Sequence, residues 1–201
     1  MKRFLAPSAF ALAALVSASL PAQAAKTSIS FEMVPSAGAK TCLPKATAHV
    51  VDATLGPVEE LTVVVAGLPA NTAFKFFSTQ VPNAPFGLSW YNGTIETDDR
   101  GVGVGNFVGR FSEGSFIVSP DVAPAPRPFP KGPFPDAGKG VKTGPVQIYH
   151  LGLWFASPAD AAKAGCANTV TPFNGEHNAG IQVLNTGNFP DLRGPLFSVK
   201  N

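Results

Sequence analysis

The segment ELTVVVAGLPANTAFKFF, residues 60–77, holds two strand-like runs separated by a turn, and it decides the fold class. Its first half contains three consecutive valines, and a β-branched run of this kind fits a buried strand. The cluster GLPAN at residues 67–71 is typical of a turn. Beyond the turn, Phe74 and Phe76 fall on one face of a strand while Lys75 falls on the other. The segment therefore predicts antiparallel β structure.

Similar short runs recur between turn signals along the rest of the chain. They lie at residues 29–34, 46–55, 88–97, 101–111, 115–118, 146–155, 180–185 and 194–199. About eight to ten short strands with turns at this spacing predict an all-β, antiparallel β-sandwich, with a β-barrel as the alternative. The run VQIYHLGLWF at residues 146–155 is apolar on both faces, which predicts a central strand covered on both sides.

One short helix is expected near residues 157–165. Ser157 can cap its first turn, Pro158 fits its first position, and Gly165 can end it in the left-handed conformation. We expect no other helix in residues 25–201, which we interpret as a single domain of ordinary size.

The dipeptide Asn92-Gly93 leaves two interpretations open. It can form a two-residue hairpin turn, in which Trp90 faces Ile95. Alternatively, it lies within one continuous strand that bulges at Gly93. The pairing of apolar with apolar and polar with polar side chains slightly favours the hairpin. The sequence DDRG at residues 98–101 is a second turn signal.

The run GVGVGNFVGR at residues 101–110 places glycines on one face of a strand and valines on the other. A glycine-lined face lets an aromatic ring or another backbone pack closely against the strand. A nucleotide-binding glycine loop is excluded, because such a loop follows a strand and opens a helix, whereas here the valine alternation continues.

Residues 119–145 are dominated by turn-forming residues. They include eight prolines and four glycines, in runs such as PAPRPFP and KGPFPDAGKG. This composition excludes a helix or a central strand and resembles polyproline II with turns. We favour a long covering loop without regular structure over a binding loop or lid.

The first 24 residues have the features of a signal peptide. Lys2 and Arg3 precede a short apolar stretch, and Ala22-Gln23-Ala24 supplies a small-residue cleavage site. The expectation is export, to the periplasm or outside the cell, and no membrane span after cleavage. The only two cysteines, Cys42 and Cys166, follow that site, and in an exported chain they are expected to form one disulfide.

The charge balance of the chain argues against one class of partner, nucleic acid. The chain has 15 Lys and Arg against 13 Asp and Glu, so loss of the two basic residues of the leader brings the net charge from +2 to zero. Phosphate backbones need a basic surplus, which argues against nucleic acid as a partner. No motif calls for a cofactor, and none is expected.

Two stretches resemble a group of exported bacterial proteins whose activities are not characterised. They are GLPANTAFKFFSTQVPNAPFGLSWYNGTIETDDRGVGVGNFVGRF at residues 67–111, and YHLGLWF with TPFNGEHNAGIQVLNT within residues 149–186. The resemblance implies bacterial origin and export, and it carries over no activity or site residue. More loosely, GLP followed by a strand and a TDxxG turn is similar to extracellular, immunoglobulin-like β-sandwich modules.

One polar cluster is a candidate for chemistry. Glu176, His177 and Asn178 form a polar loop just before a strand, and with His150 they could supply a two-histidine, one-carboxylate site. The spacing of known metal motifs is missing, and adjacent residues rarely both reach one metal. We therefore expect His150 to be a buried, hydrogen-bonded structural residue, and we expect no metal or catalytic group.

The second candidate is an aromatic ligand contact at Trp90 and Tyr91. Because no complete catalytic set is visible, the function we expect is that of an exported, non-enzymatic β-sandwich that binds an unknown extracellular ligand or surface partner. The alternative is a small secreted hydrolase or metal-dependent enzyme centred on His150, Glu176 and His177.

Overall fold

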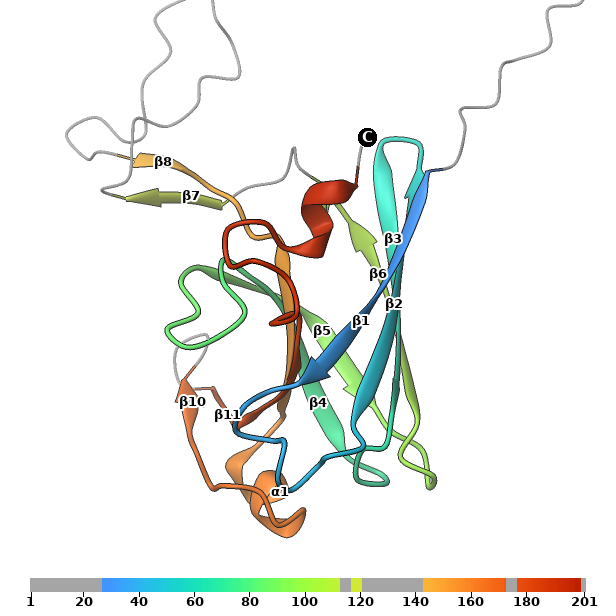
Figure 1. Ribbon diagram of the computed structural model, residues 1–201, viewed down its shortest axis with the longest axis vertical. Coiled ribbons are helices and arrows are strands. Elements are labelled where there is room, and N and C mark those ends of the chain that lie inside the picture. Colours follow the sequence, from blue (N-terminus) through green and yellow to red (C-terminus); the bar gives the residue numbers. More distant parts are fainter. Residues whose placement is uncertain (1–26, 113–116, 121–142, 173–176, 200–201) are drawn as a thin grey trace, which may run out of the picture.

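The computed structural model describes residues 27–112, 117–120, 143–172 and 177–199 (Figure 1). The expected leader, residues 1–24, lies outside them. Eight strands form one sheet in the order β5-β4-β9-β12-β1-β2-β3-β6, and every pairing is antiparallel. Their bounds are Ser28–Pro35 (β1), Thr47–Leu55 (β2), Val58–Ala66 (β3), Ala73–Thr79 (β4), Ser89–Glu96 (β5), Gly103–Gly109 (β6), His150–Phe155 (β9) and Gln182–Asn185 (β12). The all-β, antiparallel prediction is confirmed.

The sheet curls on itself, so that its two halves face each other across one core (Figure 1). β1 joins the halves, because residues 28–33 pair with β2 while Val34 and Pro35 pair with β12. The two edge strands, β5 and β6, meet at an isolated bridge between Thr97 and Gly103. The result lies between the predicted sandwich and the barrel that was its alternative.

Large apolar side chains fill the space between the two halves. Fully buried members are Val50, Leu61, Phe74, Phe76, Ile95, Leu151, Leu153, Phe155, Leu184 and Leu196. In β9 all six residues are buried, as the two-sided apolar pattern predicts. This strand begins only at His150; residues 147–149 are not in a strand, and Val146 belongs to β8, Thr143–Val146.

The hairpin interpretation of Asn92-Gly93 is wrong. β5 runs continuously through both residues, and the register against β4 shifts between Phe76 and Phe77, opposite Gly93. A Cβ at Gly93 would lie 2.6 Å from the ring of Phe107, so this glycine admits a ring instead of making a turn. The turn lies at residues 98–101 instead.

The glycine face of β6 is confirmed as a close-packing surface. A Cβ at Gly105 would lie 2.7 Å from the ring of Phe107, and this ring stacks on Phe76 with a centroid distance of 5.0 Å. The valines of the opposite face, Val104 and Val108, are exposed.

The expectation that residues 119–145 lack regular structure is wrong at both ends. β7, Ile117–Pro120, pairs antiparallel with β8. Prolines are tolerated here because each strand of a two-stranded ladder has a free edge. Residues 121–142 lie outside the described residues.

The predicted helix and disulfide are both present. α1 spans Pro158–Lys163, and the Ser157 hydroxyl accepts a hydrogen bond from the Asp160 N–H, as expected for the cap. Gly165 follows with φ of 74°. Cys42 and Cys166 are bonded, with their Cα atoms 5.2 Å apart. The bond ties the β1–β2 connection to the segment after the helix.

Smaller elements complete the fold. β10, Thr171–Pro172, pairs with β11, Asn178–Ala179, beside the main sheet, and a 3-10 helix, η1, spans Pro195–Ser198 near the C-terminus (Figure 1). No helix in the described part of the chain is both long and apolar enough to cross a membrane.

Candidate functional site

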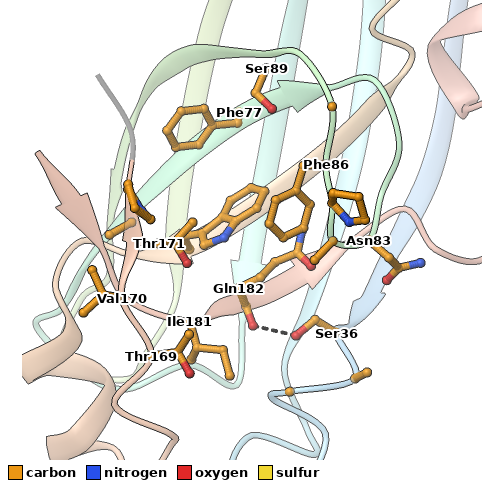
Figure 2. Close-up of a pocket in the computed structure, with 18 of the residues that line it drawn as sticks. Ser36, Phe77, Asn83, Phe86, Ser89, Thr169, Val170, Thr171, Ile181 and Gln182 are labelled. Atoms are coloured by element: carbon orange, nitrogen blue, oxygen red, sulfur yellow. Dashed lines mark hydrogen bonds between the residues drawn. The ribbon is translucent and has the colours of Figure 1, made fainter. Parts of the chain in front are cut away.

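A cleft of about 1450 Å³ opens beside the β4–β9 part of the sheet (Figure 2). One wall is the β4–β5 connection, of which residues 83–87 line the cleft. The opposite side is made by residues 36–38 after β1 and residues 169–172 around β10. Segments distant in sequence therefore converge on one concave surface, which is the usual form of a ligand site.

The β4–β5 connection is held in place by hydrogen bonds along and across it. The Gln80 N–H donates to the Leu88 carbonyl at 2.8 Å, which extends the hairpin beyond the two strands. The Pro82 carbonyl accepts from the side-chain amides of Gln182 and Asn185, both at 3.1 Å. This wall of the cleft is therefore fixed to β12 before any ligand arrives.

The floor of the cleft is a cluster of aromatic rings separate from the main core. Phe77 follows Phe76 in β4 and therefore points to the opposite face of the sheet. Trp154 of β9 packs edge-to-face between Phe77 and Phe86, with ring centroids 5.3 and 5.0 Å apart. The ring centroid of Tyr91, in β5, lies 5.3 Å from that of Phe77. Such mutual packing makes a rigid apolar floor.

Trp90 and Tyr91, the two predicted aromatic contacts, line this cleft. Trp90 is 62% exposed and Tyr91 39%. The Tyr91 hydroxyl lies 2.7 Å from Thr94 Oγ1, which also accepts from the Lys75 ammonium at 2.9 Å. Tyr91 pairs with Phe77 and presents its ring at the edge of the aromatic floor, whereas Trp90 pairs with Ser78 and points to the other face of β5.

The polar groups of the cleft are all uncharged. Among the described residues that line it, none is Asp, Glu, Lys, Arg or His. The hydroxyl of Ser36 donates to the Gln182 carbonyl at 2.5 Å, a bond drawn in Figure 2. The remaining polar side chains are hydroxyls and amides, and the Lys75 ammonium lies beside the floor, 5.8 Å from the centre of the Tyr91 ring.

His150, the first residue of β9, is buried and hydrogen-bonded, as expected. Its Nδ1 lies 2.9 Å from Thr186 Oγ1, and its Nε2 lies 3.2 and 3.0 Å from the carbonyls of Pro190 and Asp191. Carbonyls only accept, which places the hydrogen on Nε2. Burial lowers the pKa of the imidazole below its ordinary value. The neutral imidazole therefore links the segment after β12 to the sheet through these hydrogen bonds.

The structure does not bring His150 and His177 together. His177 is exposed and precedes β11, and Gly180 just beyond that strand donates to the carbonyl of Phe155. His150 and Phe155 are the two ends of β9, which at about 3.3 Å per residue lie roughly 16 Å apart. Asn178 pairs with Pro172 in β11, and Glu176 lies outside the described residues. No group of three or more potential metal ligands occurs in the part of the chain that the structure describes.

Replacing His150 with Ala is expected to lower the free energy of unfolding by roughly 2–3 kcal/mol. The change opens a buried space, removes one of the partners of the Thr186 hydroxyl, and takes the imidazole N–H from the carbonyls of Pro190 and Asp191. Urea unfolding followed by circular dichroism measures the effect. His49→Ala is the matched control, because this side chain is 50% exposed and pairs with the exposed Glu32, so its loss should cost well under about 1 kcal/mol. Equal stability of the two variants would refute the structural role of His150.

No family model matches the chain, and no curated protein or solved structure shows detectable similarity to it. The function is therefore inferred from the cleft itself.

The sequence identified two members of this cleft and missed the others. Trp90 and Tyr91 were recognisable as adjacent aromatics bordering a turn signal. Phe86 carries no such signal, because in a chain with 16 phenylalanines most aromatic residues belong to cores. The segments at 36–38 and 169–172 became neighbours only through the β1–β12 pairing and the disulfide.

Proposed function

We propose that this protein is an exported binding protein that holds an uncharged ligand in the aromatic cleft and catalyses no reaction on it. The observation that carries the proposal is the composition of the cleft: a rigid aromatic floor, the partly exposed ring of Tyr91 at its edge, and walls whose described polar residues are uncharged. Concave, mostly apolar sites with a few placed polar groups are the usual form of small-ligand sites.

Export is supported by three features that are independent of the cleft. The first 24 residues have the pattern of a cleaved leader, and the resemblance in residues 67–111 and 149–186 is to exported bacterial proteins. The disulfide between Cys42 and Cys166 fits an oxidising compartment. We therefore place the working protein in the periplasm or outside the cell.

The absence of catalysis is supported by what surrounds the hydroxyls of the cleft. A serine or threonine nucleophile needs an adjacent base within hydrogen-bond reach. Among the described lining residues the hydroxyl groups have neither a histidine nor a carboxylate beside them. The described lining residues can bind and orient a ligand, and none of them is a histidine or carboxylate that would activate a nucleophile or protonate a leaving group.

A thermal-shift screen of the purified protein tests this proposal. The panel comprises neutral oligosaccharides, uncharged peptides, fatty acids, acidic oligosaccharides and divalent metal salts. We expect an uncharged compound to raise the melting temperature, because a ligand that binds only the folded state stabilises it. The shift should disappear in Phe86→Ala and persist in Val108→Ala, whose exposed side chain lies on β6, outside the cleft. The ligand should be recovered unchanged after prolonged incubation.

Three outcomes of this screen would contradict the proposal. One is stabilisation by charged ligands alone, since none of the described lining residues is charged. Another is stoichiometric zinc, copper or iron in protein purified without chelator and lost in His177→Ala, which would favour the enzyme alternative. The third is chemical conversion of the bound compound.

A further inference from the structure

We infer that a calcium ion binds inside the sheet at the end of the β2–β3 hairpin, where Asp52, Glu59 and neighbouring hydroxyl groups supply oxygen ligands. The site lies next to the turn that joins the two strands (Figure 1), and none of its residues lines the aromatic cleft. The inference is therefore independent of the proposed function. It is carried by the strand register, by buried oxygens without hydrogen-bond partners, and by the chemistry of those oxygens.

The strand register places both acidic side chains on the inner face of the sheet. Asp52 lies opposite Leu61, a fully buried core residue, and Thr54 lies opposite Glu59. Residues opposite each other share a face, as do residues two apart in one strand, so Asp52, Thr54 and Glu59 all point inward. Asp52 and Glu59 are both fully buried. They are diagonal neighbours, roughly 7–8 Å apart along the backbone, and their side chains can reach a common point.

The segment after β6 brings a further hydroxyl to the same corner. Glu59 Oε2 accepts hydrogen bonds from the N–H groups of Phe111 and Ser112, the second at 3.0 Å. Ser112 is buried as well, so its hydroxyl lies beside the Glu59 carboxylate. Glu59 and Ser112 are 53 positions apart in sequence. The hairpin and the end of β6 therefore contribute oxygens to one buried corner, which we call the acidic corner: Asp52, Thr54, Glu59 and Ser112.

Unpaired oxygens are concentrated in the acidic corner. Seven buried side-chain N or O atoms lack a hydrogen-bond partner in the described part of the chain, and four of them are here: both carboxylate oxygens of Asp52 and the hydroxyls of Thr54 and Ser112. Hydroxyls can donate to a carboxylate, yet these two do not bond to Asp52. Protonation of Asp52 would not satisfy it either, because the new O–H would need an acceptor. Buried polar groups of this kind usually bond to an ion or an ordered water.

The charge of the acidic corner favours a cation over a water molecule. Asp52 has no Lys, Arg or His partner among the described residues, and a second acid, Glu59, lies within its reach. Burying a charge without a counter-charge is costly, and two neighbouring carboxylates repel each other. A divalent cation would remove both costs at once. A water molecule would supply hydrogen bonds but no charge.

The kind of oxygen selects the ion. The acidic corner offers carboxylate and hydroxyl oxygens and neither Cys sulfur nor His nitrogen, which suits calcium or magnesium and not zinc or copper. Ca²⁺ accepts about six to eight oxygens in flexible geometry, whereas Mg²⁺ demands a near-octahedral set. Side chains fixed by sheet register fit the flexible ion better, and water can complete its coordination. Positions 52, 54, 59 and 112 form no linear motif, so sequence patterns do not reveal the site.

Thermal unfolding of the EDTA-treated, dialysed protein tests the inference. CaCl₂ is added at about 5 mM, since extracellular calcium sites have Kd values of roughly 0.1–1 mM, and MgCl₂ and NaCl are added at equal ionic strength. Calcium should raise the melting temperature of the wild type, because a ligand of the folded state stabilises it. Asp52→Asn should lose most of this shift, although without calcium it should melt higher than the wild type, because an amide avoids the buried charge. Glu59→Gln, which keeps an oxygen acceptor for the Phe111 and Ser112 N–H groups, should lose the shift as well.

Two control variants separate the acidic corner from other effects of calcium. Asp99→Asn removes an acid whose side chain is 84% exposed, and it should keep the full shift. Phe86→Ala alters the aromatic cleft and should also keep it, so that the calcium site and the cleft can fail separately. In isothermal titration calorimetry, Asp52→Asn should raise the Kd for calcium by about tenfold or more.

Several results would overturn the inference without bearing on the cleft. If calcium did not shift the melting temperature of the wild type, the acidic corner would hold water instead of a cation. An equal shift in Asp52→Asn would show that calcium binds elsewhere. Tighter binding of Mg²⁺ than of Ca²⁺, or equal stabilisation by NaCl, would refute the assignment to calcium.

Discussion

Replacing Asp52 with Asn is expected to raise the free energy of unfolding at pH 8 by roughly 3–4 kcal/mol. Asp52 lies in β2, fully buried, and neither of its carboxylate oxygens has a hydrogen-bond partner among the described residues. Burial first, and the nearby Glu59 second, raise the pKa of this carboxyl from 3.8 to about 7. A neutral amide avoids the cost of burying that charge.

The sign of the pH dependence of stability follows from the pH range in which Asp52 is protonated in the folded chain but not in the unfolded chain. Below about pH 4, Asp52 is protonated in both the folded and the unfolded chain. Between about pH 4 and pH 7 the folded chain keeps a proton that the unfolded chain releases, so stability falls as the pH rises. Above about pH 7 Asp52 is ionised in both states, and the stability that its proton gave to the folded chain is fully lost. The gain from Asp52→Asn should therefore vanish near pH 4.

Urea unfolding of both proteins from pH 4 to pH 9 measures this difference. Asp99→Asn is the control, because the Asp99 side chain is 84% exposed, and it should shift stability by less than about 0.5 kcal/mol at any pH. If Asp52→Asn were no more stable than the wild type at pH 8, Asp52 would have to be paired or hydrated in the folded protein.

Reducing the disulfide is expected to cost up to about 5 kcal/mol, the largest effect predicted for any single bond of this protein. Cys42 and Cys166 are 124 residues apart in sequence, so the bond closes a long loop in the unfolded chain. The loss of chain entropy gives about 5 kcal/mol for a loop of this length, as an upper value. In the folded state Cys166 is buried and packs against the main core.

Guanidinium unfolding with and without reductant measures the contribution of the disulfide, and the variant Cys42→Ser with Cys166→Ser should match the reduced wild type. If the double variant and the reduced wild type are equally stable, the loss of stability comes from the missing disulfide and not from side effects of the reductant. A change below about 1 kcal/mol would mean that the loop is already constrained in the unfolded chain. Alkylation of two thiols in unreduced, unfolded protein would show that the bond is not formed.

Residue patterns in the sequence predict those parts of the fold that short-range chemistry determines. The valine run became β3, the Ser157 cap became α1, and the glycine face of β6 became a contact surface for Phe107. At Gly93 the same reasoning failed. Asn-Gly favours a turn locally, but the sheet uses this glycine to admit a ring, so tertiary packing overrides the local preference.

The site was less predictable than the fold, for a physical reason. Trp90 and Tyr91 could be identified as aromatics of possible exposure, but the cleft exists because the β4–β5 connection is fixed to β12 through Pro82 and Gln182. That contact spans 100 residues of sequence and leaves no local pattern. His150 and His177 show the converse, since the sequence offers both as candidate ligands of one site, yet opposite ends of β9 separate them.

The chain has two tryptophans, and the indole of Trp154 forms part of the cleft floor, so its resonance reports on the cleft directly. We therefore regard ¹⁹F NMR of protein labelled with 5-fluorotryptophan as the sharpest test of the central claim, that this cleft is the ligand site. The spectrum should show two resonances, assigned with Trp90→Phe. Addition of the compound that gives the largest thermal shift should move the Trp154 resonance. Saturating binding, verified by calorimetry, that leaves the Trp154 resonance unchanged would contradict the account.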